Sequence, residues 1–302
     1  MKKQSVIGSM QLLLTAIIWG VAFVAQSEGM NYVGPFTFNC VRSILGGIVL
    51  IPCIWLLNRY QSEEEKIKEY KKKDFIQGGI CCGLCLCMGT MMQQFGIQRT
   101  TVGKAGFITA LYIIFVPIVS IFLGKKSDKK IWICVLLALV GLYFLCLNGN
   151  WSIETGDIYL FIGAIFFTMH ILVIDYFAPK TDNIKMSCIQ FFVSGICCII
   201  PMLFIEKPHI NHILDAKIPI LYAGILSSGV AYTLQIIGQK KVKPAIASLI
   251  MSAESVVSVI AGWILLQEEL SAREILGCVI ILIGILLAQI DTKQLYYKKG
   301  RI

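Results

Sequence analysis

The sequence predicts an all-α integral membrane protein, in which ten transmembrane helices form two five-helix repeats of inverted topology. Three observations support this fold: ten apolar stretches long enough to cross a bilayer, Lys and Arg residues gathered in alternate connections, and a pattern that recurs in the two halves. Charged residues make up 15% of the chain and its mean hydropathy is +0.75, values that exclude a soluble globular protein.

The hydrocarbon core of a bilayer is about 30 Å thick, and a helix needs roughly 17–25 apolar residues to cross it. The longest connection between the apolar stretches, residues 58–74, contains SEEEKIKEYKKK, which predicts a short solvated helix. No connection can hold a soluble domain, so any binding site must lie within the helix bundle. The predicted spans, numbered one to ten, are residues 10–27, 35–57, 75–97, 105–123, 131–147, 157–177, 186–205, 218–237, 245–266 and the short stretch 275–290.

The first span follows Lys2 and Lys3, a start that is also typical of a secretory signal peptide. The apolar run has no A-x-A cleavage site after it, and the charge pattern of the whole chain agrees with a retained segment. We therefore interpret this segment as the first transmembrane helix.

The net charge of +9 comes from 27 Lys and Arg residues against 18 Asp and Glu residues. With the N-terminus in the cytoplasm, 21 of the 27 lie on the cytoplasmic side, and Arg42 lies within the second span. This distribution follows the positive-inside rule, so we expect a multi-pass protein of the plasma membrane with both termini cytoplasmic. The basic surplus then reflects topology and attraction to anionic lipids, and it predicts no nucleic acid partner. The five outer residues are Arg99, Lys104, Lys207, Lys217 and Arg273.

All 12 cysteines fall within predicted spans, where we interpret them as small, polarisable packing residues rather than as a disulfide framework. The C-x-x-C of Cys82 and Cys85 has no histidine or carboxylate nearby to complete a metal site. The sequence also lacks a phosphate-binding glycine loop and a nucleophile–base pair. We therefore predict no cofactor, no metal and no enzyme activity.

The two halves of the chain, residues 1–150 and 151–302, repeat a sparse pattern of small and apolar residues, with the same order of gaps and helix breakers. Because each half has five spans, an odd number, the two copies enter the membrane from opposite sides. Inverted repeats are common in secondary transporters, which bind their substrate near the midplane between the halves. The matches are Gly8, Leu12 and Ala16 with Gly156, Leu160 and Ala164; Gly89, Ile97, Val102 and Ala105 with Gly229, Ile237, Val242 and Ala245; and Leu139 and Gly141 with Leu282 and Gly284.

Ionisable residues at membrane depth are costly, at roughly 2.5–3.5 kcal/mol each at the centre of a span, and they are candidate functional residues. Glu254 lies at the midplane of the ninth span among small residues. It is a candidate for binding a proton or a cationic group, and the alternative is a structural residue that pairs with Arg42 or caps a kink. Arg42 is a candidate anchor for a substrate carboxylate, or a structural ion pair. His170 in the sixth span could line a pathway or pack against its neighbours.

Uncharged polar and aromatic side chains form a second group of candidates. A cavity lined by amides and aromatic rings suits an amphipathic organic solute better than a bare ion. The alternative is hydrogen bonding between helices, worth about 0.6–2 kcal/mol per contact. The group consists of Trp19, Gln93, Gln94, Tyr112, Tyr232 and Gln235.

Three segments carry a resemblance to a known family: AIIWGVAFVAQ in the first span, GKAGFITALYIIFVPIVSIFLGKK around the fourth, and ASLIMSAESVVSVIAGWILLQEELSAREILGCVIILIGILLA at the end. Over essentially the whole chain the sequence resembles the EamA family of the drug/metabolite transporter superfamily. The resemblance implies ten helices in two inverted repeats. It also implies a central cavity lined by the first, third, fourth, sixth, eighth and ninth helices. Its expected wall residues here are Trp19, Met92, Gln93, Tyr112, Phe167, His170, Tyr232 and Glu254.

One position departs from the family pattern. The acidic residue expected after the ninth span matches Glu268, whereas its counterpart after the fourth span is Lys125. We therefore assign no function to that position.

Together these observations predict a secondary transporter, driven by a gradient or by exchange, that moves small organic metabolites by alternating access. The resemblance favours export of amino-acid-like or drug-like solutes, with protons as a candidate coupling ion. The expected partners are the solute and membrane lipid, and a monomer is consistent with the sequence. The alternative function is a lipid-carrier flippase component of similar architecture, whose cavity would open sideways to lipid.

Overall fold

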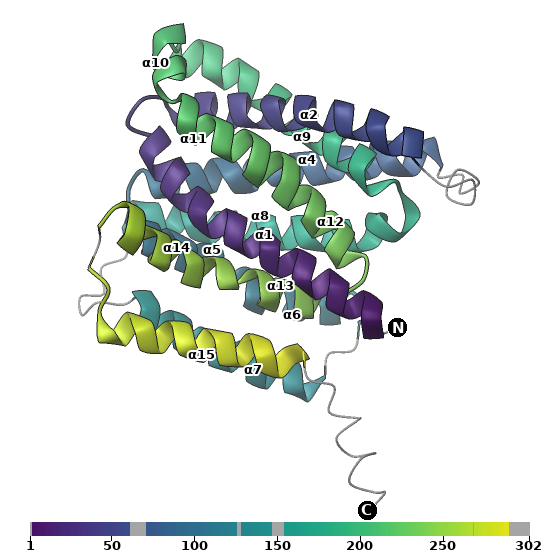
Figure 1. The fold of residues 1–302 in the computed structure, drawn as a ribbon, viewed down its shortest axis with the longest axis vertical. Helices are drawn as coiled ribbons and strands as arrows, with labels where there is room; N and C mark the ends of the chain where they lie inside the picture. Colours follow the sequence, from purple (N-terminus) through teal and green to yellow (C-terminus); the bar gives the residue numbers. More distant parts are fainter. Residues whose placement is uncertain (1, 61–70, 126–127, 147–153, 268, 290–302) are drawn as a thin grey trace, which may run out of the picture.

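A computed structural model describes residues 2–60, 71–125, 128–146, 154–267 and 269–289 (Figure 1). Within these ranges, nine helical segments are long and apolar enough to cross a membrane. A tenth apolar helix, α7 (Lys129–Cys146), lies at the predicted fifth span. The described helices therefore occupy all ten predicted positions. Most of the solvated helix expected in the connection 58–74 lies at residues 61–70, outside the described ranges.

Helices in the first half are α1 (Lys2–Gly29), α2 (Pro35–Tyr60), α4 (Lys72–Ile97), α5 (Val102–Thr109), α6 (Tyr112–Phe122) and α7. In the second half they are α8 (Thr155–Phe177), the short 3₁₀ helix η1 (Ala178–Lys180), α9 (Asn183–Pro201), the π-helical η2 (Met202–Glu206), α10 (Ile210–Asp215), α11 (Lys217–Leu221), the π-helical η3 (Tyr222–Tyr232), α12 (Thr233–Gln239), α13 (Pro244–Met251), α14 (Ala253–Leu265) and α15 (Ala272–Gln289).

Large apolar side chains cover the outer surface of the bundle. Phe122 is 85% exposed, Ile200 67% and Met10 66%. Many polar side chains are buried instead, among them Asn39 and Gln94. This reversal of the usual pattern is expected where lipid rather than water surrounds the protein, because lipid tails accept apolar side chains at no cost.

The packing of α4 against α8 shows that these helices run in opposite directions. A side chain at Gly78 would meet Phe177, one at Gly89 would meet Phe167, and one at Gly96 would meet Leu160. Residue numbers therefore rise along α4 as they fall along α8. Since α4 is the third span and α8 the sixth, the second half begins in the sense opposite to the first, as five spans per repeat require.

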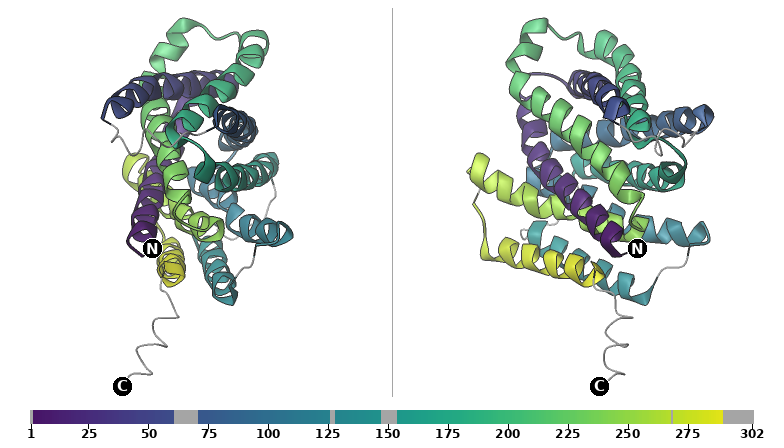
Figure 2. Two further views of the ribbon diagram at one scale, coloured as in Figure 1. Left: turned by 90° about the vertical axis from the view of Figure 1, so that its right-hand side faces the viewer. Right: turned by 45° about the vertical axis from the view of Figure 1, so that its right-hand side comes forward.

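Helix contacts are themselves two-fold symmetric. The third span (α4) packs on the sixth and seventh spans (α8 and α9). In the same way, the eighth span (η3 and α12) packs on the first and second spans (α1 and α2). The second and seventh spans pair with each other, and so do the fifth and tenth. In Figures 1 and 2, α7 and α15 lie side by side along one edge of the bundle, and α2 and α9 lie toward the opposite edge. The central helices between these edges enclose the site described below.

Glycines bring α7 and α15 into close contact. A Cβ atom at Gly141 would lie 2.7 Å from the carbonyl oxygen of Gly277, and one at Gly277 would lie 2.6 Å from that of Gly141. Small residues at helix interfaces allow this close approach in membranes, where dispersion contacts rather than the hydrophobic effect hold helices together.

The fourth and ninth spans each consist of two helices rather than one. α5 and α6 are separated at Ala110 and Leu111, and α13 and α14 at Ser252. Ala110 has ψ −5° and Ser252 has ψ −12°, far from the α-helical value of about −42°. The amides three residues later bond to the carbonyls of Ala110 and Ser252. These i→i−3 bonds tighten the chain into a turn in the middle of the span.

The two breaks occur at equivalent places. Positions 110 and 252 lie 142 residues apart. The same separation holds between the first residues of α5 and α13, and between Tyr112 and Glu254. Both repeats therefore present a break at the same depth, and the residue two positions after each break faces the centre of the molecule.

Candidate solute-binding site

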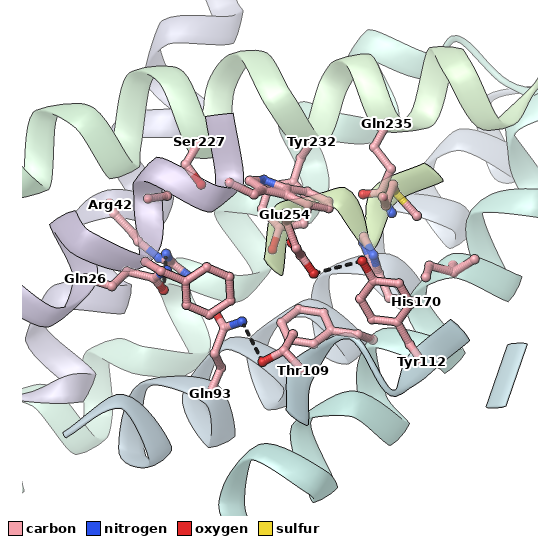
Figure 3. A pocket seen from close by; sticks show the side chains of 16 residues that line it. Gln26, Arg42, Gln93, Thr109, Tyr112, His170, Ser227, Tyr232, Gln235 and Glu254 are labelled. Atoms are coloured by element: carbon pink, nitrogen blue, oxygen red, sulfur yellow. Dashed lines mark hydrogen bonds between the residues drawn. The ribbon is translucent and has the colours of Figure 1, made fainter. Parts of the chain in front are cut away.

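A narrow cavity lies at the centre of the bundle, and 16 side chains line it (Figure 3). They come from α1, α2, α4, α5, α6, α8, η3, α12, α13 and α14, so the first, second, third, fourth, sixth, eighth and ninth spans all contribute. The volume open to the centre of a water molecule is about 30 Å³. By this measure one water needs roughly 10–15 Å³, so the cavity has room for about two waters.

Glu254 lies in the cavity wall in the first turn of α14, directly after the break at Ser252. The side chain is 3% exposed. Tyr112 donates a hydrogen bond from its hydroxyl to Oε1 of Glu254, with an O–O distance of 2.8 Å. This bond joins equivalent positions of the two halves and therefore lies on the pseudo-two-fold axis. The turn before α14 orients the carboxylate, and the helix N-terminus stabilises its negative charge.

Arg42 lies in the same wall but is not paired with Glu254. Its Nη1 donates to Oε1 of Gln26 at 2.9 Å, and its guanidinium lies 5.8 Å from the centre of the Phe38 ring. Figure 3 shows Arg42 and Gln26 at one end of the cavity, with Glu254 nearer its middle. The ion pairs found among the described residues join lysines to aspartates and include neither residue. One cavity thus holds a buried guanidinium and a buried carboxyl group that are not in contact with each other.

Two polar atoms in the wall have no hydrogen-bond partner within the described part of the chain. They are Nε1 of Trp19, a donor, and Oε1 of Gln235, an acceptor. Buried polar groups cost about 1–3 kcal/mol when unpaired, so these atoms are available to a bound water or solute. Gln93, by contrast, donates to the hydroxyl of Thr109 at 3.3 Å.

Aromatic rings form one side of the cavity around Tyr232. The Trp19 and Tyr232 ring centres are 4.5 Å apart, and the His170 ring lies edge-on to Tyr232 at 5.8 Å. His170 is 1% exposed, and its Nε2 lies 3.0 Å from Oε1 of Gln190 on α9. His170 therefore has both a packed ring and a polar partner, while still lining the cavity.

Nine of the eleven candidate residues from the sequence lie in this wall: Trp19, Arg42, Gln93, Tyr112, Phe167, His170, Tyr232, Gln235 and Glu254. Gln94 does not: its side chain is buried, and its Nε2 donates to the backbone oxygen of Gln26 at 3.1 Å. Met92 also lies outside the wall. Met92 is half-buried and lies beside Gly163 of α8, because adjacent helix residues point about 100° apart and Gln93 takes the cavity-facing position. Glu268, the acidic residue of the family pattern, lies outside the described residues.

Sequence reasoning missed several wall residues, of which Gln26, Thr109 and Ser227 are polar. Gln26 is near the end of its span, where a polar residue is ordinarily solvated. Thr109 and Ser227 are small hydroxyl residues that occur throughout membrane helices. The break after Thr109 would have been the useful signal, and the sequence does not show it.

Comparison with known proteins decides the family. The model of the EamA-like transporter family matches residues 6–147 and again residues 154–289. The chain belongs to the EamA-like transporter family. The two matches divide this EamA-like protein into two repeats, and the resemblance noted in the sequence is confirmed. The chain is therefore a multi-pass membrane transporter rather than an enzyme.

Curated relatives of this EamA-like protein are also transporters. An uncharacterized transporter of Archaeoglobus fulgidus is 28% identical over 92% of this chain and 84% of its own length. The uncharacterized transporter YoaV of Bacillus subtilis is 22% identical, over 91% of this chain and 94% of its own. A crystal structure of a protein with 17% identity superimposes with a TM-score of 0.74, over 95% of this chain and 96% of that one, which supports the fold.

Proposed function

We propose that this protein is a secondary transporter that exports small amino-acid-like solutes by alternating access. The observation that carries the proposal is the presence of a basic and an acidic side chain, Arg42 and Glu254, in the wall of one central cavity. Two buried charges are expensive in a membrane unless each has a partner. A zwitterionic solute supplies both partners at once.

Recognition follows from the position of each group. The guanidinium of Arg42 binds the solute carboxylate, for which its planar fork of N–H donors is well suited. Glu254 accepts hydrogen bonds from the solute ammonium. Trp19 and Tyr232 offer an apolar face to the solute side chain, while Nε1 of Trp19 and Oε1 of Gln235 provide further polar contacts.

Coupling to protons uses the same carboxylate. Glu254 would bind the solute ammonium while the loaded site turns outward, and a proton while the empty site turns back inward. Its charge is therefore neutralised in both changes of access. The Tyr112 hydroxyl, which can donate to the charged form, holds Glu254 between these events. Exchange of a proton for a solute needs no ATP-binding motif.

The cavity is too small for an amino acid, so binding requires the helices around it to separate. The breaks in the fourth and ninth spans are where such movement would occur, because discontinuous helices at the midplane let the two halves of a span tilt independently. The proposed direction, export, follows the resemblance to the EamA family noted in the sequence.

The test is solute flux in proteoliposomes of the full-length protein, with a pH gradient imposed. The panel consists of L-leucine, L-phenylalanine and L-serine, together with isopentylamine and 4-methylpentanoate, which lack the carboxylate or the ammonium of leucine. We expect flux of at least one amino acid to exceed that of both single-charge analogues. Glu254→Gln should abolish this flux, while Glu28→Gln, at the outer end of α1, should leave it unchanged.

Undiminished flux in Glu254→Gln would remove Glu254 from the mechanism. A lipid-scrambling assay on the same vesicles tests the flippase alternative. Scrambling without flux of any amino acid in the panel would replace the proposal with that function.

A further inference from the structure

A second and larger cavity opens at the end of the bundle where α6, α8 and α12 finish and α7 and α13 begin. Its volume open to the centre of a water molecule is about 590 Å³. By the predicted topology this end faces the cytoplasm. We call this cavity, lined by residues including Ser120, Asp175, Gln239 and Lys243, the cytoplasmic vestibule.

The vestibule is strongly basic. Four lysines line it, against one carboxylate, that of Asp175. Lys125 at the end of α6 forms an ion pair with Asp175, and Lys241 donates to Oε1 of Gln11 at 3.0 Å. The other two are Lys240 and Lys243, both exposed, and Lys243 directly precedes the first residue of α13. The positive charge of this group exceeds what Asp175 can balance, so the cavity concentrates anions.

Two buried polar atoms in the vestibule wall are unsatisfied. The Ser120 hydroxyl and Oε1 of Gln239 lack hydrogen-bond partners within the described residues, although the side chains are only 5% and 2% exposed. Nε2 of Gln239 donates to the backbone oxygen of Ile171 at 3.2 Å, and Ile171 lines the central cavity. The vestibule wall therefore contacts the wall of the solute site.

We propose that the cytoplasmic vestibule is a second binding site, which captures the carboxylate of a small organic solute before it enters the central cavity. This inference rests on the proposed function and names a distinct site for the same class of solute. Lys243 attracts the carboxylate, and Ser120 offers it a hydroxyl donor. Oε1 of Gln239 accepts from the ammonium, and Pro117, Ile131 and Val242 provide apolar contact for the remainder of the solute.

The first experiment measures binding without transport. The full-length protein in phosphatidylcholine vesicles is treated with acetic anhydride, and mass spectrometry follows acetylation of each lysine in the presence of L-leucine, 4-methylpentanoate or isopentylamine. L-leucine and isopentylamine are amines that consume anhydride themselves, so the rate at Lys243 is expressed relative to the rates at Lys72 and Lys73, which are exposed at the start of α4 on the same face. We expect both carboxylates to lower this ratio severalfold, and isopentylamine to leave it unchanged.

The second experiment measures transport of the amino acid from the panel with the highest flux. Lys240→Gln/Lys243→Gln should raise its half-saturating concentration by about tenfold, since the local field sets solute concentration, and should leave the maximal flux unchanged. The matched double variant Lys72→Gln/Lys73→Gln should change neither quantity.

The two proposals fail in different ways. Protection of Lys243 in the Glu254→Gln variant, which should carry no flux, would show that the vestibule binds solute independently of the central site. Protection of Lys243 in the wild type together with undiminished flux in Glu254→Gln would support the vestibule and remove Glu254 from the mechanism. Equal acetylation with all three probes, or an unchanged half-saturating concentration in the double variant, would overturn the vestibule proposal. So would protection of Lys243 by added phosphatidylglycerol with displacement of 4-methylpentanoate, because the occupant would then be a lipid headgroup.

Discussion

The hydrogen bond between Tyr112 and Glu254 has a contribution to stability that can be measured directly. It is buried, 2.8 Å long, and the only side-chain hydrogen bond of Glu254 seen among the described residues. Hydrogen bonds to charged groups contribute about 1.5–3 kcal/mol, and bonds between neutral groups about 0.5–1.5 kcal/mol. A double-mutant cycle with Tyr112→Phe and Glu254→Leu, neither of which retains the bond, should therefore give a coupling energy of about 1.5–3 kcal/mol if Glu254 is a carboxylate in the resting protein. It should give about 0.5–1.5 kcal/mol if Glu254 is protonated.

The assay is reversible unfolding of the purified protein in mixed detergent micelles, followed by tryptophan fluorescence, for the wild type, both single variants and the double variant. Tyr222→Phe is the control, because its hydroxyl donates to the backbone oxygen of Ile18 and touches no carboxylate. Tyr222→Phe and Glu254→Leu should be additive. A coupling energy below about 0.5 kcal/mol for Tyr112 and Glu254 would refute the claim that this bond joins the two halves.

Three further outcomes are expected. Gly277→Ala should lower the free energy of unfolding by about 1–3 kcal/mol, because its Cβ would overlap the Gly141 carbonyl, while Gly103→Ala, with its nearest atom at 3.4 Å, should be close to neutral in the same assay. Glu206→Gln should cost about 0.3–2 kcal/mol by thermal unfolding, since Glu206 accepts from two backbone amides at the start of α2, and an unchanged melting temperature would contradict this. Arg42→Gln should reduce flux of amino acids in the panel more than flux of isopentylamine, and an equal reduction would argue that Arg42 is structural.

The positions of the spans could be predicted from the sequence, because the length and hydropathy of an apolar run are dictated by bilayer thickness. Glu254 and Arg42 could be identified for a related reason: a charge at membrane depth is costly enough that few occur. The direction in which each side chain points was harder to predict from the sequence. Met92 and Gln93 are neighbours on α4, and only contacts with other helices decide which of them faces the cavity.

The helix breaks could not be predicted, because no proline or glycine stands at Ala110, Leu111 or Ser252. Pro117 lies within α6 rather than at its break. The turns are stabilised by tertiary contacts, such as the bond from the Ser255 hydroxyl to the backbone oxygen of Gly106 across the two broken spans. Such contacts are absent from any local pattern, so propensity alone favours a continuous helix.

The contact between positions 112 and 254 also bears on how such a chain could arise. Were the protein a homodimer of one repeat, symmetry would place identical residues at this point: two glutamates would repel each other, and two tyrosines would offer no carboxylate. Fusing duplicated halves into one polypeptide removes that constraint, because each copy can then mutate separately. A donor facing an acceptor on the axis of pseudosymmetry is an arrangement that two copies of identical sequence cannot encode.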